Sequence, residues 1–495
     1  MRTMIALVFL FVFSSCALAQ TVEERLQELE KTLKRQEQAI QELKTLQNTV
    51  KKQEKTIEEQ RKLIERLTKK GGEAQPSGTG AAAEAPQTAA AEQVKQEVEE
   101  LKDQVISVAE AQKKQVLSVF NPAIGLVGET IFSYRSLGSK ATGSDRPGGF
   151  DVNQRSVELN LAATIDPFAK GYAVINASSD PITGEATAVV EEAALLTTSL
   201  PCNLTLQAGR FFGEFGRLSY IHDHELPFVN RPLVLDQYIG GESRTDGVQL
   251  NYLLPIEHYV SLTAGVGNNF GAVPVDINDT TNGNFRSFGG LAFWGRGSTS
   301  FDLTADLSLE AGVSGLINPK TIDREGVLAL PNNTTVTYLG STLQQKDRSL
   351  EGVDVALSWK PLTINQFQTL TWGTEFLHSG SDFTVTGMSP DGTILFPPST
   401  HYVDAYGMYS YLNYKFHRQW NAGFLLDWVE NSANSADKTV AYSPYITWVI
   451  SHWNQLRLQY THTDHNAVSG LRPDDAIYLQ WAWIIGSHAH GWQQR

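Results

Sequence analysis

Cysteine is nearly absent from this chain, with two residues in 495. Cys16 lies in a predicted targeting segment, so a mature chain would keep only Cys202, which excludes a disulfide framework and a cysteine-based zinc site. Long apolar runs are also lacking. Beyond residue 19 no stretch reaches the roughly 18 consecutive apolar residues of a membrane-spanning helix. The sequence therefore predicts no helical membrane protein.

An excess of positive charge is missing too. The formal net charge is −14, and nucleic-acid-binding domains favour a basic surface, so we expect no nucleic-acid partner. The motifs G-x-S-x-G, G-x-x-x-x-G-K and H-E-x-x-H do not occur in the chain. We therefore expect no enzyme and no cofactor.

The first 19 residues have the pattern of a secretory signal peptide. Arg2 precedes an apolar run at 5–13, and Ala17 and Ala19 are small residues at the −3 and −1 positions of a cleavage site before Gln20. The alternative is lipidation of Cys16, because residues 14–16 faintly resemble a lipobox. In both cases the protein leaves the cytoplasm.

Residues 20–70 carry apolar residues at spacings of three and four among many charged ones, which predicts a coiled coil that self-associates in the periplasm. A single solvated helix is the alternative. Residues 71–91 form a Gly-, Pro- and Ala-rich linker, and 92–118 a short second coiled-coil helix. The coiled coil is also a candidate contact with peptidoglycan.

Residues 119–495 change to short alternating runs. Leu307, Leu309, Ala311 and Val313, for example, alternate with polar or small residues, as in a half-exposed strand. About sixteen such runs, short turns at one end and long loops at the other predict an antiparallel transmembrane β-barrel. A soluble β-sandwich is the alternative, because alternation alone does not separate the two. Tyr and Trp near run ends favour the barrel and outer-membrane lipid around it.

The segment 204–255 contains two strand-like runs around a long Gly- and charge-bearing insert. Long ordered loops are usually functional, so we predict that 213–243 folds into the barrel and narrows it. The residues predicted at this constriction are Arg217, His222, Asp223, His224, Glu225, Arg231, Asp236 and Arg244. Strand parity predicts as lumen-facing Glu158, Glu310, Asp354, Glu375, Asp427 and Arg457.

A family resemblance rests on three stretches: GRFFGEFGR at 209–217, LPFVNRPLV at 226–234 and DGVQL at 246–250. In these the chain resembles distant phosphate-selective porins of the O/P group. With the start at 121–124 it also resembles uncharacterised barrels labelled zinc-regulated TonB-dependent receptors. The porin resemblance implies a homotrimer of sixteen-stranded barrels, each with its own pore.

The charges differ from those expected for phosphate. The predicted loop has arginines but no lysine, and acids outnumber bases among the predicted lumen residues. Acidic rings favour cations. We therefore expect a porin in the bacterial outer membrane that passes small hydrophilic solutes with a weak cation preference. The alternatives are a substrate-specific channel for a metal ion or oxyanion, and a structural envelope tether that uses the coiled coil.

His222, Asp223, His224 and Glu225 form the sharpest chemical cluster in the sequence. Imidazoles and carboxylates are ligands for Zn²⁺ and similar ions, so His222 and His224 are candidate metal ligands. The alternative is a hydrogen-bonded polar loop.

Overall fold

The computed structural model describes residues 122–138, 146–271, 288–319, 322–329, 335–363, 365–388 and 394–486. The predicted signal peptide, both predicted coiled-coil segments and the linker lie outside these residues. Among the described residues, no helix has the length and hydropathy needed to cross a membrane.

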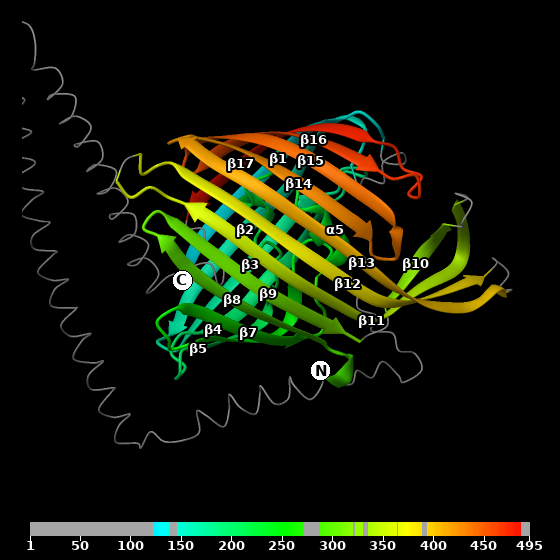
Figure 1. The fold of residues 1–495 in the computed structure, drawn as a ribbon, viewed down its shortest axis with the longest axis horizontal. Helices are drawn as coiled ribbons and strands as arrows, with labels where there is room; N and C mark the ends of the chain where they lie inside the picture. Colours follow the sequence, from blue (N-terminus) through cyan, green and yellow to red (C-terminus); the bar gives the residue numbers. More distant parts are fainter. Residues whose placement is uncertain are drawn as a thin grey trace, which may run out of the picture. The chain divides into compact units, whose positions relative to one another are not determined.

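Most of the described chain is β-strand (Figure 1). The strands are β1 (Ala123–Arg135), β2 (Gly149–Asp166), β3 (Ala169–Ser179), β4 (Ala186–Thr197), β5 (Leu204–Phe212), β6 (Arg244–Leu253), β7 (Tyr259–Gly267), β8 (Ala292–Thr304), β9 (Leu307–Asn318), β10 (Ile322–Ala329), β11 (Thr335–Trp359), β12 (Thr369–Met388), β13 (Ile394–His417), β14 (Trp420–Asn431), β15 (Asn434–Ser451), β16 (Asn454–His465) and β17 (Asp474–Gly486). Within the described residues, three short helices accompany them: η1 (Asp223–Glu225), α5 (Leu233–Tyr238) and η3 (Phe288–Gly290).

The sheet closes on itself. From β1 to β9 and from β11 to β17, each strand pairs antiparallel with the next strand in the sequence. The circuit is completed by the pairing of β9 with β11 and of β1 with β17. β10 pairs only with β11 among the described strands, so it stands outside the circuit of the other sixteen. The predicted sixteen-stranded antiparallel barrel is thus confirmed. Closure gives every strand of the circuit two partners, so the circuit itself has no open sheet edge.

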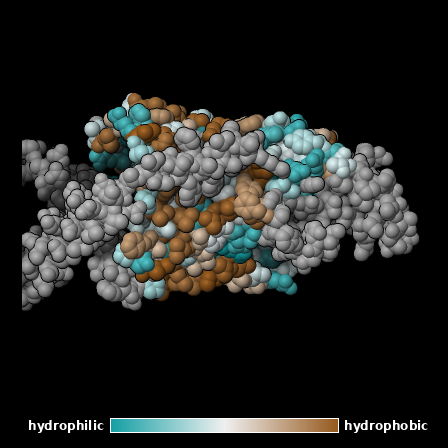
Figure 2. All heavy atoms as spheres, turned by 90° about the horizontal axis from the view of Figure 1, so that it is seen from below, coloured by the Kyte–Doolittle hydropathy of each residue, from teal (hydrophilic) through white to brown (hydrophobic). Residues whose placement is uncertain are grey.

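The outward strand face is apolar and the inward face is polar, the reverse of a soluble β-protein. In the paired strands β9 and β11, Val313 lies opposite Val353, and these side chains are 58% and 54% exposed. Polar residues of the opposite face, such as Glu158, Gln249 and Gln480, are buried inside. A soluble sandwich would bury the apolar face, whereas a membrane barrel presents it to lipid. Figure 2 shows hydrophobic residues over much of one side and hydrophilic residues nearer its ends.

The two ends of the barrel differ in their connections. At one end β2–β3, β8–β9, β13–β14 and β15–β16 are joined by two residues each, and we call this the short-turn end. At the other, the long-loop end, 31 residues separate Phe212 of β5 from Arg244 of β6. Exposed Trp448 and Trp453 lie beside the short-turn end. This matches the aromatic belt expected where a barrel leaves the hydrocarbon.

Candidate functional site

Residues 213–243, which connect β5 with β6 and contain η1 and α5, fold into the barrel; we call them the inward loop. Phe215, Leu226, Phe228 and Leu235 are fully buried there. Gly216 permits the entry of the chain. Its φ is +58°, and a Cβ atom at this position would collide with the Glu375 carboxylate of β12.

One side of the inward loop packs against the barrel wall as a dry core. Most of its buried apolar side chains form one cluster with residues of β4, β5, β8, β9 and β11–β15. Phe228 makes edge contacts with Tyr411 and Tyr445, at centroid distances of 5.7 and 6.2 Å. This burial holds the loop to that part of the wall, because each fully buried aromatic ring contributes roughly 1.5–3 kcal/mol.

The loop is also hydrogen-bonded to the wall, mostly through its backbone. The Val229 N–H donates to Gln459 Oε1 at 2.7 Å, and Arg457 Nη1 donates to the Phe228 carbonyl at 3.0 Å. The Leu233 N–H donates to Asp427 Oδ1 at 3.2 Å, and the Tyr238 hydroxyl donates to the Glu430 carbonyl at 3.0 Å. Polar residues that would otherwise line a lumen therefore satisfy the loop's backbone.

Arg231 braces the loop from within. Its buried guanidinium donates to the carbonyls of Leu218 at 2.8 Å and Ile221 at 2.6 Å, and lies 2.7 Å from Asp223. Burial by itself raises the pKa of Asp223, but Arg231 and Arg155 outweigh it and lower that pKa to about 2. Asp223 is therefore a carboxylate across the physiological range.

The side of the loop that faces β2 and β4 is charged. His222 Nε2 lies 2.9 Å from Glu192 Oε1, and His222 Nδ1 lies 3.4 Å from Glu158 Oε2 and 3.6 Å from Glu191 Oε2. His224 Nδ1 lies 3.1 Å from Glu158 Oε1.

Burial acts to lower the pKa of both imidazoles. For His222, Glu158, Glu192 and Glu191 outweigh burial, and its pKa is raised well above the usual value. For His224, Glu158 has the same effect and the pKa is raised. In the absence of other cations, the rings supply the positive charge that these carboxylates need.

The predicted constriction residues occupy different environments. His222, His224 and Arg231 are buried, Arg217 and Asp223 are half-buried, and Glu225 and Asp236 are exposed. Arg244 is the first residue of β6. The structure gathers Asp223, Arg231, Asp236 and Arg244 around one cavity, and Arg217 lines another.

The six residues predicted from strand parity lie on the inner wall. Glu375 accepts from the Arg217 N–H at 3.2 Å, and Glu310 lies 2.7 Å from Arg217 Nη1. Asp354 pairs with buried Arg296 at 2.6 Å. The contacts of Glu158, Asp427 and Arg457 with the loop are those given above. All six therefore surround the loop or the cavity beside it.

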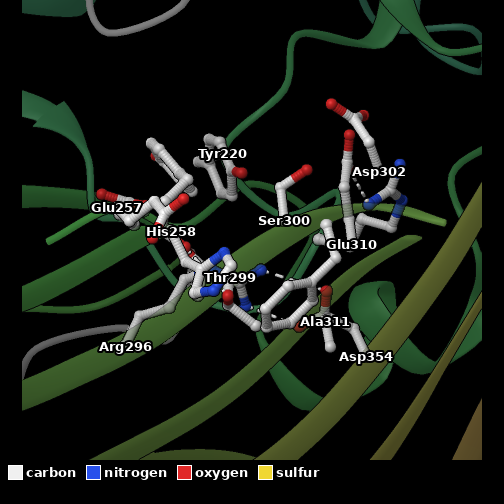
Figure 3. Close-up of a pocket in the computed structure, with 15 residues that line it drawn as sticks. Tyr220, Glu257, His258, Arg296, Thr299, Ser300, Asp302, Glu310, Ala311 and Asp354 are labelled. Carbon is white, nitrogen blue, oxygen red and sulfur yellow. Dashed lines mark hydrogen bonds and ion pairs between the residues drawn. The ribbon is translucent and has the colours of Figure 1, made fainter. Parts of the chain in front are cut away.

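Described residues of the wall and the inward loop line a larger and a smaller cavity beside the loop. The larger, of about 810 Å³, is lined by five carboxylates and two arginines, together with Tyr220, His258 and hydroxyl side chains (Figure 3). Figure 3 shows Tyr220 and Glu257 on one side of this space, with Asp302 and Glu310 on the other. The smaller, of about 200 Å³, is lined by six carboxylates and three arginines. Both polar linings suit water and small hydrophilic solutes.

Parity missed several inner residues. Arg155 of β2 forms a bidentate ion pair with Glu129 and donates to the Val229 carbonyl at 2.6 Å. It is the extra residue where the β1–β2 register shifts, between the pairs Glu129–Ser156 and Thr130–Gln154. A bulge re-aims a side chain that strict alternation would send outward. Arg296 was also not predicted, although it lies on the regular strand β8.

The fold and the loop together define a membrane-spanning β-barrel whose interior is shared between its own inward loop and polar cavities. No family model matches the chain. It is 28% identical over 362 residues to an uncharacterized protein of Aquifex aeolicus (strain VF5), which covers 69% of each chain.

Among solved structures, the high-pH form of Pseudomonas putida OprB is 11% identical, with a TM-score of 0.48 over 76% of this chain and 97% of that one. The outer membrane channel DcaP of Acinetobacter baumannii is 10% identical, with a TM-score of 0.46 over 74% and 98%. The barrel itself is established by the strand pairing described above.

Proposed function

We propose that the chain is a channel of the bacterial outer membrane through which small hydrophilic solutes diffuse passively. The observation that carries this proposal is the inverted barrel: apolar outside, polar inside, with a cavity of about 810 Å³ beside the inward loop. In porins, barrels of sixteen to eighteen strands leave an aqueous channel, so a circuit of sixteen strands is wide enough for one. The inward loop is the constriction, and no bond is made or broken.

The charge of the cavities favours cations. Carboxylates outnumber arginines in both linings, and residues such as Glu310 are exposed to the larger cavity. Most arginines there are paired: Arg217 with Glu310, Arg231 with Asp223 and Arg296 with Asp354. The net negative lining attracts cations and repels phosphate, so the selectivity is a weak cation preference.

A second candidate is a closed barrel that serves as an envelope tether. It is favoured by the contacts of the inward loop with separate parts of the wall, at Glu158 of β2 and at Asp427 of β14. In this role the predicted periplasmic coiled coil would be the functional element, and the loop would be a plug.

Single-channel recording of the full-length protein in planar bilayers separates the two. The channel predicts steady conductance of the wild type, and a homotrimer predicts three equal steps. A variant in which 222–240 are replaced by a short Gly-Ser linker is expected to conduct more. A silent wild type whose shortened variant conducts would overturn the channel and establish the plug.

A further inference from the structure

Two histidines of the inward loop and carboxylates of three different segments form two overlapping groups of candidate ligands. His222, His224 and Glu158 offer ligand atoms that all lie within 4.8 Å of one another, as do His222, Glu191 and Glu242. His222 belongs to both groups. The side chains of His222, His224 and Glu158 are at most 3% exposed.

The spacings suit a shared ion. Zn–N and Zn–O bonds of about 2.0–2.1 Å in a tetrahedron place two ligand atoms about 3.3–3.4 Å apart. His222 Nδ1 lies 3.4 Å from Glu158 Oε2 and 3.6 Å from Glu191 Oε2. These separations are longer than the 2.7–3.2 Å typical of N–H···O hydrogen bonds. A small inward movement would bring the three atoms around one cation.

The cluster is accessible from water. Glu158, Glu191 and Glu242 line the cavity of about 200 Å³, so an ion that enters it meets carboxylate oxygens before it meets the imidazoles behind them. Borderline ions such as Zn²⁺ accept nitrogen and oxygen donors together, whereas Mg²⁺ and Ca²⁺ prefer oxygen alone. The donor set therefore selects a divalent transition-metal cation.

We propose that His222, His224, Glu158 and Glu191 bind one divalent transition-metal cation, with Glu242 as a further donor at the edge of the site. The site rests on the proposed channel, since the ion reaches it through the lumen. It links the inward loop to β2 through Glu158 and to β4 through Glu191. An ion bound there joins the inward loop to both strands.

The direct test measures Zn²⁺ binding to the purified full-length protein by equilibrium dialysis and by X-ray absorption at the zinc edge. We expect one tightly bound ion with two imidazole nitrogens and carboxylate oxygens in its shell. His222→Gln with His224→Gln is expected to weaken binding by more than about 100-fold, since both nitrogen ligands are lost, and loss of outer-shell partners alone costs about 10–100-fold.

A matched control changes two other histidines that contact carboxylates. His378 lies 2.8 Å from Glu351 and 2.9 Å from Asp404, and His462 lies 2.9 Å from Asp475. His378→Gln with His462→Gln should bind Zn²⁺ as the wild type does. Heat-dependent mobility on gels verifies that each variant is folded. Should the loop variant fail to fold, the absorption spectrum of the wild type and the single change Glu191→Gln decide instead.

A wild type that binds no Zn²⁺, a zinc shell without imidazole, or equal affinity in the loop variant would overturn the site. These measurements need no conductance, so they are independent of the channel. If Zn²⁺ binds as expected but the wild type is silent in bilayers, the site stands and the proposed function fails. If the channel conducts and Zn²⁺ does not bind, the proposed function stands and the metal site fails.

Discussion

Glu191 and Glu192 are consecutive residues of β4, and yet both side chains are buried inside the barrel. The pairing with β3 passes from Val174–Glu192 to Ile175–Val190, so Glu191 is an extra residue in a bulge. Both carboxylates reach the same imidazole, that of His222. The bulge thereby doubles the negative charge that one strand presents to the inward loop.

Arg231 is expected to determine how firmly the inward loop is held. In Arg231→Met the carbonyls of Leu218 and Ile221 lose a charged donor, and Asp223 loses its partner. Hydrogen bonds of this kind contribute about 1.5–3 kcal/mol each, so local opening of the loop becomes at least tenfold more frequent. Hydrogen exchange of the loop amides, measured by mass spectrometry, reports this change.

The control for Arg231 is Arg210→Met. Arg210 is paired with Asp246 at 2.7 Å, but both side chains are 39% exposed. Exposed ion pairs contribute about 0–1 kcal/mol, so loop exchange should stay close to that of the wild type. Equal exchange rates in Arg231→Met and Arg210→Met would contradict the bracing role of Arg231.

The strict alternation of apolar and polar residues was enough to predict the main features of the fold. It predicted the sixteen-strand barrel, and all six residues assigned by parity lie on the inner wall. It missed Arg155 and Glu191 because a bulge inserts one residue and breaks the period of two, and no local pattern around them marks the shift. The partners of His222 could not be predicted either, since Glu158 and Glu192 are 64 and 30 residues away and meet it only after the barrel closes.

Phe228 tests whether apolar packing fixes the loop. It is fully buried against Tyr411 and Tyr445. Phe228→Ala leaves a cavity, and changes of this type cost about 3–5 kcal/mol. We expect trypsin to cleave the folded barrel after Arg217, which precedes Leu218, much faster than in the wild type. Phe376→Ala is the control, because Phe376 is 47% exposed. Unchanged cleavage in Phe228→Ala would show that the polar contacts alone hold the loop.

Glu310 offers a test of selectivity. Its side chain is 48% exposed and lines the larger cavity beside Arg217. Glu310→Gln removes a negative charge from the lining, so reversal potentials in a salt gradient should shift towards anions. Arg217→Gln should shift them towards cations, and Glu185→Gln, in the exposed β3–β4 connection, should leave them unchanged. Both shifts shrink at high salt because exposed charges are screened. A shift of the same sign for Glu310→Gln and Arg217→Gln would contradict control by the cavity charge.

Contact of the outward face with lipid can be tested by placing an arginine at two depths in the membrane. Val313 lies in the middle of β9, is 58% exposed and is paired with Val353. In Val313→Arg a charge faces the centre of the hydrocarbon, which costs about 2–4 kcal/mol in membrane barrels and falls to about 0–1 kcal/mol near the interface. Leu303→Arg is the matched change, because Leu303 is 51% exposed but lies two residues before the β8–β9 turn. Urea titration of folding into lipid vesicles should therefore show a large loss of stability for Val313→Arg and a small one for Leu303→Arg. Equal losses for the two would mean that this surface does not face lipid, and the channel proposal would fail with it.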